Sequence, residues 1–112
     1  MQYRQIAEDY AVSPQIAAAD VALIKEAGFK SIICNRPDGE DPGQPEADEI
    51  RKAAEAAGLE FRWVPVVSGQ MSPKNVEDQA QALDELTRPV FAYCRSGTRC
   101  ANLYLGVQQL RS

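Results

Sequence analysis

The residues of this chain with the clearest chemical potential form the segment Cys94-Arg95-Ser96-Gly97-Thr98-Arg99. A cysteine is nucleophilic as the thiolate, and its pKa falls near a helix N-terminus or a cation. The chain contains no histidine, which excludes Cys–His dyads, Ser-His-Asp triads and histidine-based zinc sites. We therefore expect Cys94 to be a catalytic nucleophile that backbone N–H groups, a helix dipole and two arginines activate.

The same segment is suited to holding an anion. It follows an apolar run, residues 90–93, and precedes a helical pattern, residues 101–110, so it is predicted to join a strand to a helix. Successive N–H groups in such a loop can point inward and bind an oxyanion. Gly97 gives the backbone the freedom that this curl needs.

Each charged or polar side chain near this loop has an expected role. Arg99 is expected to be catalytic, because its guanidinium can bind an oxyanion through two N–H groups. Arg95 is expected at the mouth of the pocket, and the hydroxyls of Ser96 and Thr98 are expected to bond to loop carbonyls or to the thiolate. The predicted substrate-binding residues are Arg95, Ser96, Gly97, Thr98 and Arg36.

The loop after residue 34 allows further interpretations. Arg36 either adds positive potential to the pocket or pairs with Asp38 as a structural contact. Asp38 and Glu40 could supply an acid from an unusual direction, although a solvated acidic loop is the interpretation we favour for Glu40.

The remaining cysteines, Cys34 and Cys100, are expected to be small buried residues. Two alternatives stay open: Cys100 could resolve an oxidised Cys94, and Cys34 could form a disulfide with Cys94. The chain has no Cys-x-x-Cys spacing, which argues against a metal site. An odd cysteine count and no secretory pattern predict free thiols in a reducing, cytoplasmic compartment.

Strand and helix patterns alternate along the chain, which predicts an α/β fold with a mainly parallel sheet of four to five strands and flanking helices. The expected strands cover residues 10–13, 31–34, 59–67 and 90–93, the expected helices cover 20–27, 46–57, 72–86 and 101–110, and residues 35–45 form a loop. Leu103, Val107 and Leu110 should face inward, and Phe61 and Trp63 should belong to the core. Residues 1–112 are expected to be a single domain.

Composition narrows the range of partners. The formal net charge of −4 disfavours nucleic acid and anionic membranes as partners, and no apolar stretch approaches the length of a membrane span. An anion site on this chain must therefore be local.

Residues 94–99 resemble the active loop of rhodanese-type sulfurtransferases, whereas the order of segments along the chain resembles dual-specificity and tyrosine phosphatases. Both resemblances meet in the phosphatase-like domains of bacterial beta-lactamase hydrolase-like proteins, which occur alone or joined to persulfide dioxygenases; residues 35–40 and 93–99 carry this likeness. The resemblance implies a tyrosine-phosphatase-like fold in which the four predicted strands take the order 1-2-4-3. It also implies that Cys34 and Cys94 lie at neighbouring strand ends.

Three departures from phosphatases favour sulfur transfer. Four residues separate Cys94 from Arg99, where a phosphatase loop has five, and this shorter loop makes a smaller cradle. Ser68 occupies the place of the aspartate that acts as general acid, and a serine cannot protonate a leaving alkoxide effectively. Tyr93 stands where phosphatases have a histidine.

We therefore expect a rhodanese-like sulfurtransferase that passes sulfane sulfur through a Cys94 persulfide. Sulfite and thiolates leave as stable anions, so this chemistry needs no acid. The expected partners are a small anionic sulfur donor (thiosulfate or a persulfide), a thiol acceptor and, from the resemblance, a persulfide dioxygenase; no metal or organic cofactor is expected. The alternatives are a cysteine-based phosphatase, which is a hydrolase with a phosphocysteine intermediate, and a non-catalytic anion-binding or partner-docking module.

Overall fold

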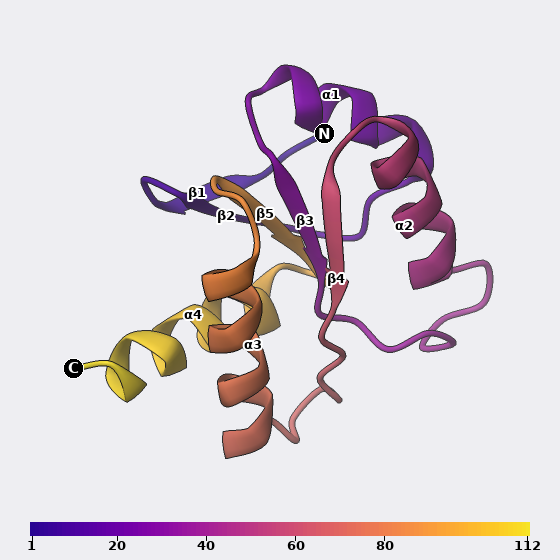
Figure 1. Ribbon diagram of the computed structural model, residues 1–112. Helices are drawn as coiled ribbons and strands as arrows, with labels where there is room; N and C mark the ends of the chain where they lie inside the picture. Colours follow the sequence, from indigo (N-terminus) through magenta and orange to yellow (C-terminus); the bar gives the residue numbers. More distant parts are fainter.

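Four parallel strands and one antiparallel edge strand form the central sheet of the computed structural model, which describes residues 1–112 (Figure 1). The strands are β1 (Arg4–Ala7), β2 (Tyr10–Ser13), β3 (Ser31–Cys34), β4 (Glu60–Trp63) and β5 (Val90–Tyr93), in the order β1-β2-β5-β3-β4. Every residue of β2, β3 and β5 is buried, because helices cover both faces of these strands.

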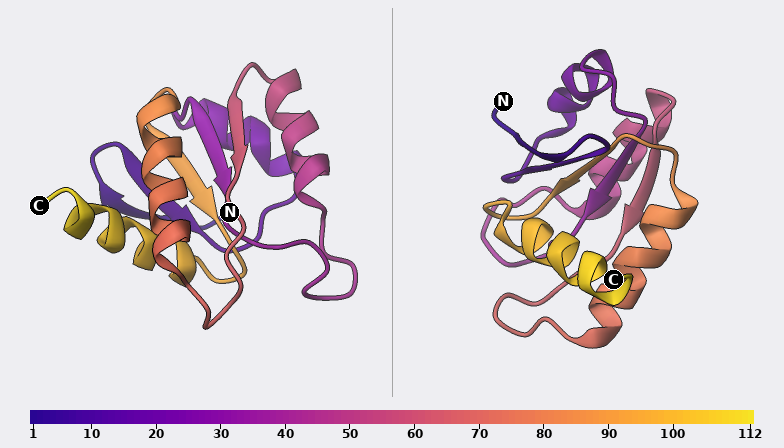
Figure 2. Two further views of the ribbon diagram at one scale, coloured as in Figure 1. Left: turned by 60° about the horizontal axis from the view of Figure 1, so that its bottom comes forward. Right: turned by 90° about the vertical axis from the view of Figure 1, so that its left-hand side faces the viewer.

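The helices form two layers around the sheet. They are the 3₁₀ turn η1 (Ala18–Asp20), α1 (Val21–Glu26), α2 (Ala47–Ala56), α3 (Pro73–Glu85) and α4 (Thr98–Leu110). One core cluster joins α1 and α2 to one face of the sheet, and a second joins α3 and α4 to the other. Figure 2 shows α3 and α4 lying together on their side of the sheet.

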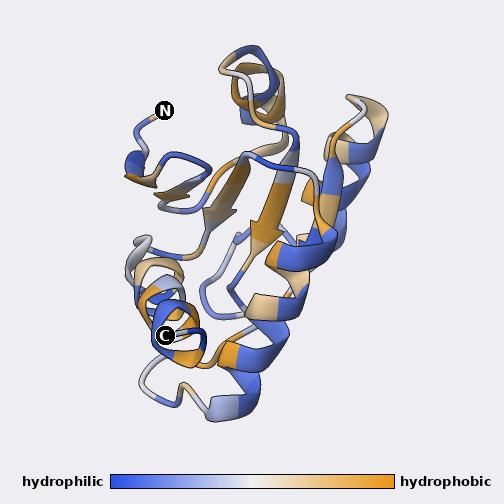
Figure 3. Ribbon diagram, turned by 60° about the vertical axis from the view of Figure 1, so that its left-hand side comes forward, coloured by the Kyte–Doolittle hydropathy of each residue, from blue (hydrophilic) through white to orange (hydrophobic).

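Side chains alternate between these two cores along each central strand. On β5, Val90 and Ala92 belong to the α3/α4 core, whereas Phe91 and Tyr93 belong to the α1/α2 core. Figure 3 shows the resulting pattern, with hydrophobic strands inside and hydrophilic outer faces on the helices. None of the helices combines the length and the apolar character that a membrane span requires.

Short sequence patterns predicted most of the helices and strands correctly. Ser72 caps α3 as its spacing with Pro73 indicates, because its hydroxyl accepts a hydrogen bond from the N–H of Asn75 at 3.2 Å. The predicted mainly parallel sheet with flanking helices is confirmed.

Several expectations about the fold were wrong. The edge strand β1 was not predicted, and the strand expected over residues 59–67 ends at Trp63. The order 1-2-4-3 is incorrect, since β5 lies between β2 and β3, although residues 31–34 and 90–93 are neighbours as expected. Leu110 is 55% exposed and Trp63 is 45% exposed, because the end of α4 and the edge strand β4 extend beyond the two core layers.

Candidate active site

The loop between β5 and α4 curls around the sulfur of Cys94. Gly97 is the N-cap of α4, with a φ of 91°, and its N–H donates a hydrogen bond of 3.1 Å to Cys94 Sγ. The N–H of Cys94 itself donates to the carbonyl oxygen of Ser13 on β2 at 3.2 Å. The strand end therefore fixes the backbone of Cys94 while the first turn of α4 directs N–H groups at its sulfur.

These contacts lower the pKa of the Cys94 thiol to about 5. The largest cause is a hydrogen bond from the Cys100 side chain, followed in stabilising effect by the backbone N–H groups of Cys100, Ser96 and Gly97; burial opposes them. Cys94 is consequently a thiolate at neutral pH. Hydrogen bonds to the sulfur lead this effect: the expected backbone N–H groups contribute, and the Cys100 thiol, which was not expected to, contributes most.

Cys100→Ala is expected to raise the pKa of Cys94 by roughly 1, since it removes one hydrogen bond to a charged group. The measurement is the thiolate absorbance near 240 nm against pH, with the curve of Cys94→Ser subtracted. Cys34→Ala serves as the control, and a Cys94 pKa that stays at its wild-type value in Cys100→Ala would contradict the assignment.

Gly97→Ala is expected to lower the free energy of unfolding by about 1–2 kcal/mol, because residue 97 has a left-handed conformation. The added Cβ would also lie 3.4 Å from the backbone of Ser13. The matched control is Gly43→Ala, which introduces a Cβ at a φ of 76° with no atom within 4 Å. Urea unfolding should show losses in both variants, and only Gly97→Ala should also raise the pKa of Cys94.

Arg99 lies beside Cys94 in the first turn of α4, and three of its five N–H groups are occupied. Nη1 donates to Glu40 Oε2 at 2.8 Å and to the Val66 carbonyl at 2.9 Å, while Nη2 donates to Glu40 Oε1 at 2.9 Å. The remaining Nε–H and the second Nη2–H lie on one edge of the planar guanidinium. That edge has no protein partner and matches the fork that binds an oxyanion.

Arg36 is buried next to Glu40 and Arg99, with only 3% of its side chain exposed, and it contacts three other side chains. It donates to Glu40 Oε1 at 2.8 Å, to Gln15 Oε1 at 2.9 Å and to Asp41 Oδ2 at 2.7 Å. It does not pair with Asp38, which instead accepts a hydrogen bond of 2.8 Å from the N–H of Ala47 at the start of α2.

Glu40 is not the solvated loop residue that we expected. Its carboxylate bridges Arg36 and Arg99, and the hydrogen bond from Arg99 is the main reason that its pKa falls to about 2. From the sequence, Glu40 was considered only as an acid or a solvated residue, and Gln15 was not singled out, because neither stands at a recognisable spacing from Arg99.

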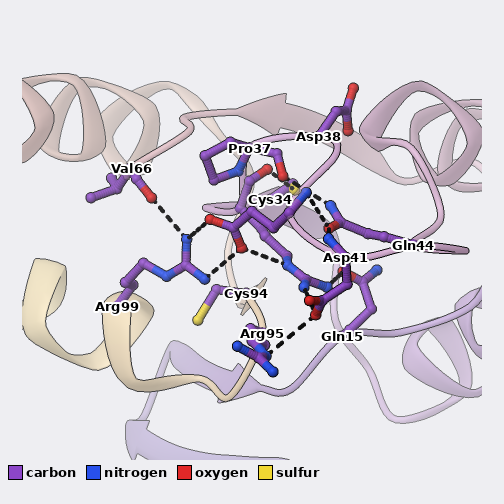
Figure 4. Close-up of polar contacts among 12 residues, drawn as sticks. Gln15, Cys34, Pro37, Asp38, Asp41, Gln44, Val66, Cys94, Arg95 and Arg99 are labelled. Carbon is purple, nitrogen blue, oxygen red and sulfur yellow. Dashed lines mark hydrogen bonds and ion pairs between the residues drawn. The ribbon is translucent and has the colours of Figure 1, made fainter. Parts of the chain in front are cut away.

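The other loop side chains lie at the surface. Arg95 is 68% exposed, and its one ion pair, with Asp41, is 3.4 Å long. In Figure 4 the Cys94 side chain lies between Arg99 and Arg95. The hydroxyls of Ser96 and Thr98 hydrogen-bond to each other at 3.1 Å, so within this part of the loop it is the backbone that reaches the sulfur.

An open hollow of about 780 Å³ borders the loop. One wall is the loop and the start of α4, and the other is the segment after β4; the lining residues include Arg95, Ser96, Thr98, Arg99, Val67 and Ser68. Cys94 is fully buried and does not itself line this hollow, although its neighbours Arg95, Ser96 and Arg99 do. A substrate therefore reaches the sulfur only when a neighbouring side chain moves, and the loosely paired Arg95 is better placed to move than Arg99.

The three cysteines are free thiols in two separate cores. Cys34 pairs in register with Tyr93 and belongs to the α1/α2 core, whereas Cys94 and Cys100 belong to the α3/α4 core. Neighbouring strand ends thus do not bring Cys34 and Cys94 together, because the two side chains point to opposite faces of the sheet. Cys100 is the thiol adjacent to Cys94.

Comparisons with known proteins agree with this arrangement. A beta-lactamase hydrolase-like protein of Agrobacterium fabrum is 38% identical over 105 residues, which cover 94% of this chain and 24% of that protein. A Xylella fastidiosa protein of the same description is 35% identical over 104 residues, which are 93% of this chain and 24% of the relative. The chain thus spans about a quarter of the length of these relatives.

A solved structure from Neisseria meningitidis, described as a "putative phosphatase", superposes with a TM-score of 0.84 and 39% identity, over 90% of this chain and 72% of that one. The catalytic core of the yeast phosphatase Siw14 shares 12% identity with a TM-score of 0.71, over 96% of this chain and 65% of that one, which shows likeness of fold alone. Residues 2–110 match the family described as "Beta-lactamase hydrolase-like protein, phosphatase-like domain". The chain, a phosphatase-like domain built around a cysteine loop, therefore belongs to this family.

Proposed function

We propose that this domain is a cysteine-dependent hydrolase of phosphate monoesters, and that Cys94 carries the phosphoryl group as a phosphocysteine. The observation that carries the proposal is the Cys94 thiolate at the N-terminus of α4, next to an unpartnered edge of Arg99. The likeness to phosphatases favours this chemistry over the sulfur transfer that we expected from the sequence.

The reaction has two displacements. The thiolate forms an S–P bond while the P–O bond to the leaving group breaks, and the loop N–H groups with Arg99 stabilise the charge on the equatorial oxygens. Water then attacks phosphorus, the S–P bond breaks, and Cys94 returns as a thiolate with release of inorganic phosphate. Burial of the sulfur keeps it out of bulk water between turnovers.

The carboxylates near the loop are each engaged by other groups: Glu40 by Arg99 and Arg36, Asp41 by Arg36 and Arg95, and Asp38 by the N–H of Ala47. Ser68 lines the hollow at the expected place, and Glu40, with a pKa of about 2, is ionised at neutral pH. The leaving group must therefore depart as an anion, which restricts efficient turnover to esters of acidic alcohols such as nitrophenol.

Alkyl phosphates are accordingly expected to react more slowly than 4-nitrophenyl phosphate by roughly the 10²- to 10⁴-fold that a general acid supplies. Ser68→Asp should selectively accelerate phenyl phosphate, because it places an acid at the missing position. Gln70→Asp, in the same exposed segment, is the matched control for added charge. Equal rates for good and poor leaving groups in the wild-type protein would show that another acid operates.

Sulfur transfer is the second candidate, favoured by the absence of that acid. In this reaction the Cys94 thiolate takes the outer sulfur of thiosulfate, sulfite leaves with the bonding electrons, and the persulfide passes its sulfur to a thiol. Incubation with thiosulfate would then add about 32 Da to the protein, in intact mass spectrometry, and would not do so in Cys94→Ser. Phosphate release without this mass gain supports the phosphatase; the mass gain without phosphate release supports the transferase.

A persulfide dioxygenase partner and a cytoplasmic location remain proposals for this chain. The dioxygenase partner is supported by the family resemblance and by relatives about four times longer than the matched region. The cytoplasmic location is supported by the odd number of cysteines, all of them free thiols. Failure of both assays would favour the anion-binding or docking module.

A further inference from the structure

The loop that follows β3 holds a carboxylate directly against the guanidinium of the cysteine loop. Glu40 lies five residues before the end of the loop at Pro45 and 59 positions before Arg99, yet its two oxygens meet Nη1 and Nη2 of Arg99 at 2.8 and 2.9 Å. We propose that Glu40, fixed from behind by buried Arg36, is the positioning residue that orients Arg99 for oxyanion binding. This inference rests on the proposed function only in taking the loop to be an anion site.

The geometry assigns each edge of Arg99 a separate task. Glu40 occupies the end of the guanidinium through one N–H of each Nη, and the Val66 carbonyl takes the other N–H of Nη1. Two anchors on different segments fix both the position and the plane of the group. The Nε–H and the remaining Nη2–H are left together on the edge that is free to bind a ligand.

Glu40 is itself held by a rigid partner. Its Oε1 also accepts from Arg36 Nε at 2.8 Å, and Arg36 is 3% exposed and fixed by Gln15 and Asp41. A buried guanidinium needs compensating partners, so this assembly resists rearrangement. Arg95 lacks such a support, because Asp41 contacts it at 3.4 Å and both side chains are well exposed.

If Glu40 acted only through its negative charge, its removal would change the affinity for an anion in the opposite direction, so the direction of the change tests the proposal. An ionised carboxylate near an anion site repels the ligand, so its removal would tighten anion binding if charge were its only influence. If Glu40 positions Arg99, its removal weakens binding despite the gain in net positive charge.

The experiment measures the dissociation constant of inorganic phosphate by titration calorimetry at neutral pH. Arg99→Ala is expected to weaken binding by about 10- to 100-fold, the range of a lost charge-assisted contact. Glu40→Gln should weaken it several-fold in the wild-type background and should not weaken it when Arg99 is already alanine.

Asp48→Asn, on the exposed face of α2, is the control for an unrelated carboxylate, and thermal unfolding identifies variants that lose structure. Tighter phosphate binding in Glu40→Gln, or the same weakening with and without Arg99, would overturn the proposal. Absence of phosphate binding by the wild type would also overturn it. Phosphate binding with this pattern but without any turnover would support the inference while refuting the proposed hydrolase.

Discussion

Cys94→Ser is expected to abolish turnover, with a loss on the order of 10⁶-fold in kcat, the scale seen when a covalent nucleophile is removed. The hydroxyl of serine stays protonated at neutral pH, whereas the Cys94 thiol, with a pKa of about 5, is ionised. The loop N–H groups and Arg99 remain in the variant. Steady-state hydrolysis of 4-nitrophenyl phosphate, with phosphate binding measured in parallel, should therefore show binding without catalysis.

Cys34→Ala is the matched control for this variant, because Cys34 is a buried thiol on the opposite face of the sheet. It should keep the wild-type rate. Residual activity of Cys94→Ser above a few per cent of the wild type would show that another group is the nucleophile.

Arg99→Ala is expected to lower kcat/KM by about 10²- to 10³-fold, the range for losing one preorganised group that stabilises an oxyanion. Arg99→Lys should recover little of this loss, because an ammonium cannot bind Glu40 and the Val66 carbonyl while also presenting a second two-donor edge. The measurement is kcat and KM with 4-nitrophenyl phosphate for both variants.

Arg111→Ala provides the control on the same helix, since Arg111 pairs with Asp84 at the far end of α4. Its kcat/KM should match that of the wild type. An Arg99→Lys variant with full activity would mean that positive charge alone, without the fork, serves the reaction.

The sequence was a good guide where a short segment determines its own structure. Pro73 after Ser72, the apolar run 90–93 and Gly97 before a helical pattern each specify a local conformation, and the structure contains all of these features. The predicted end of β5, followed by the cysteine loop and α4, was sufficient to locate the candidate site.

Contacts between distant segments were harder to predict. The position of β5 between β2 and β3 depends on which buried strands pair, and the apolar runs are too similar to specify it. The Glu40–Arg99 contact depends on how the loop after β3 folds back over the sheet edge, and an acidic residue in a Pro/Gly-rich loop looks the same whether it is solvated or paired.

The sheet also acts as a partition between two independently packed halves of the molecule. Ile50 and Ala54 of α2 pack on one side, whereas Cys94 and Cys100 lie on the other, with β3 and β5 between them. Since distant substitutions without shared neighbours have additive energies, positions in the α1/α2 core that contact neither the loop after β3 nor Tyr93 can change stability with little effect on the hydrogen bonds to the sulfur. Substitutions such as those at Ile50 or Ala54 can thus change the stability of the domain while the candidate site on the opposite face keeps its geometry.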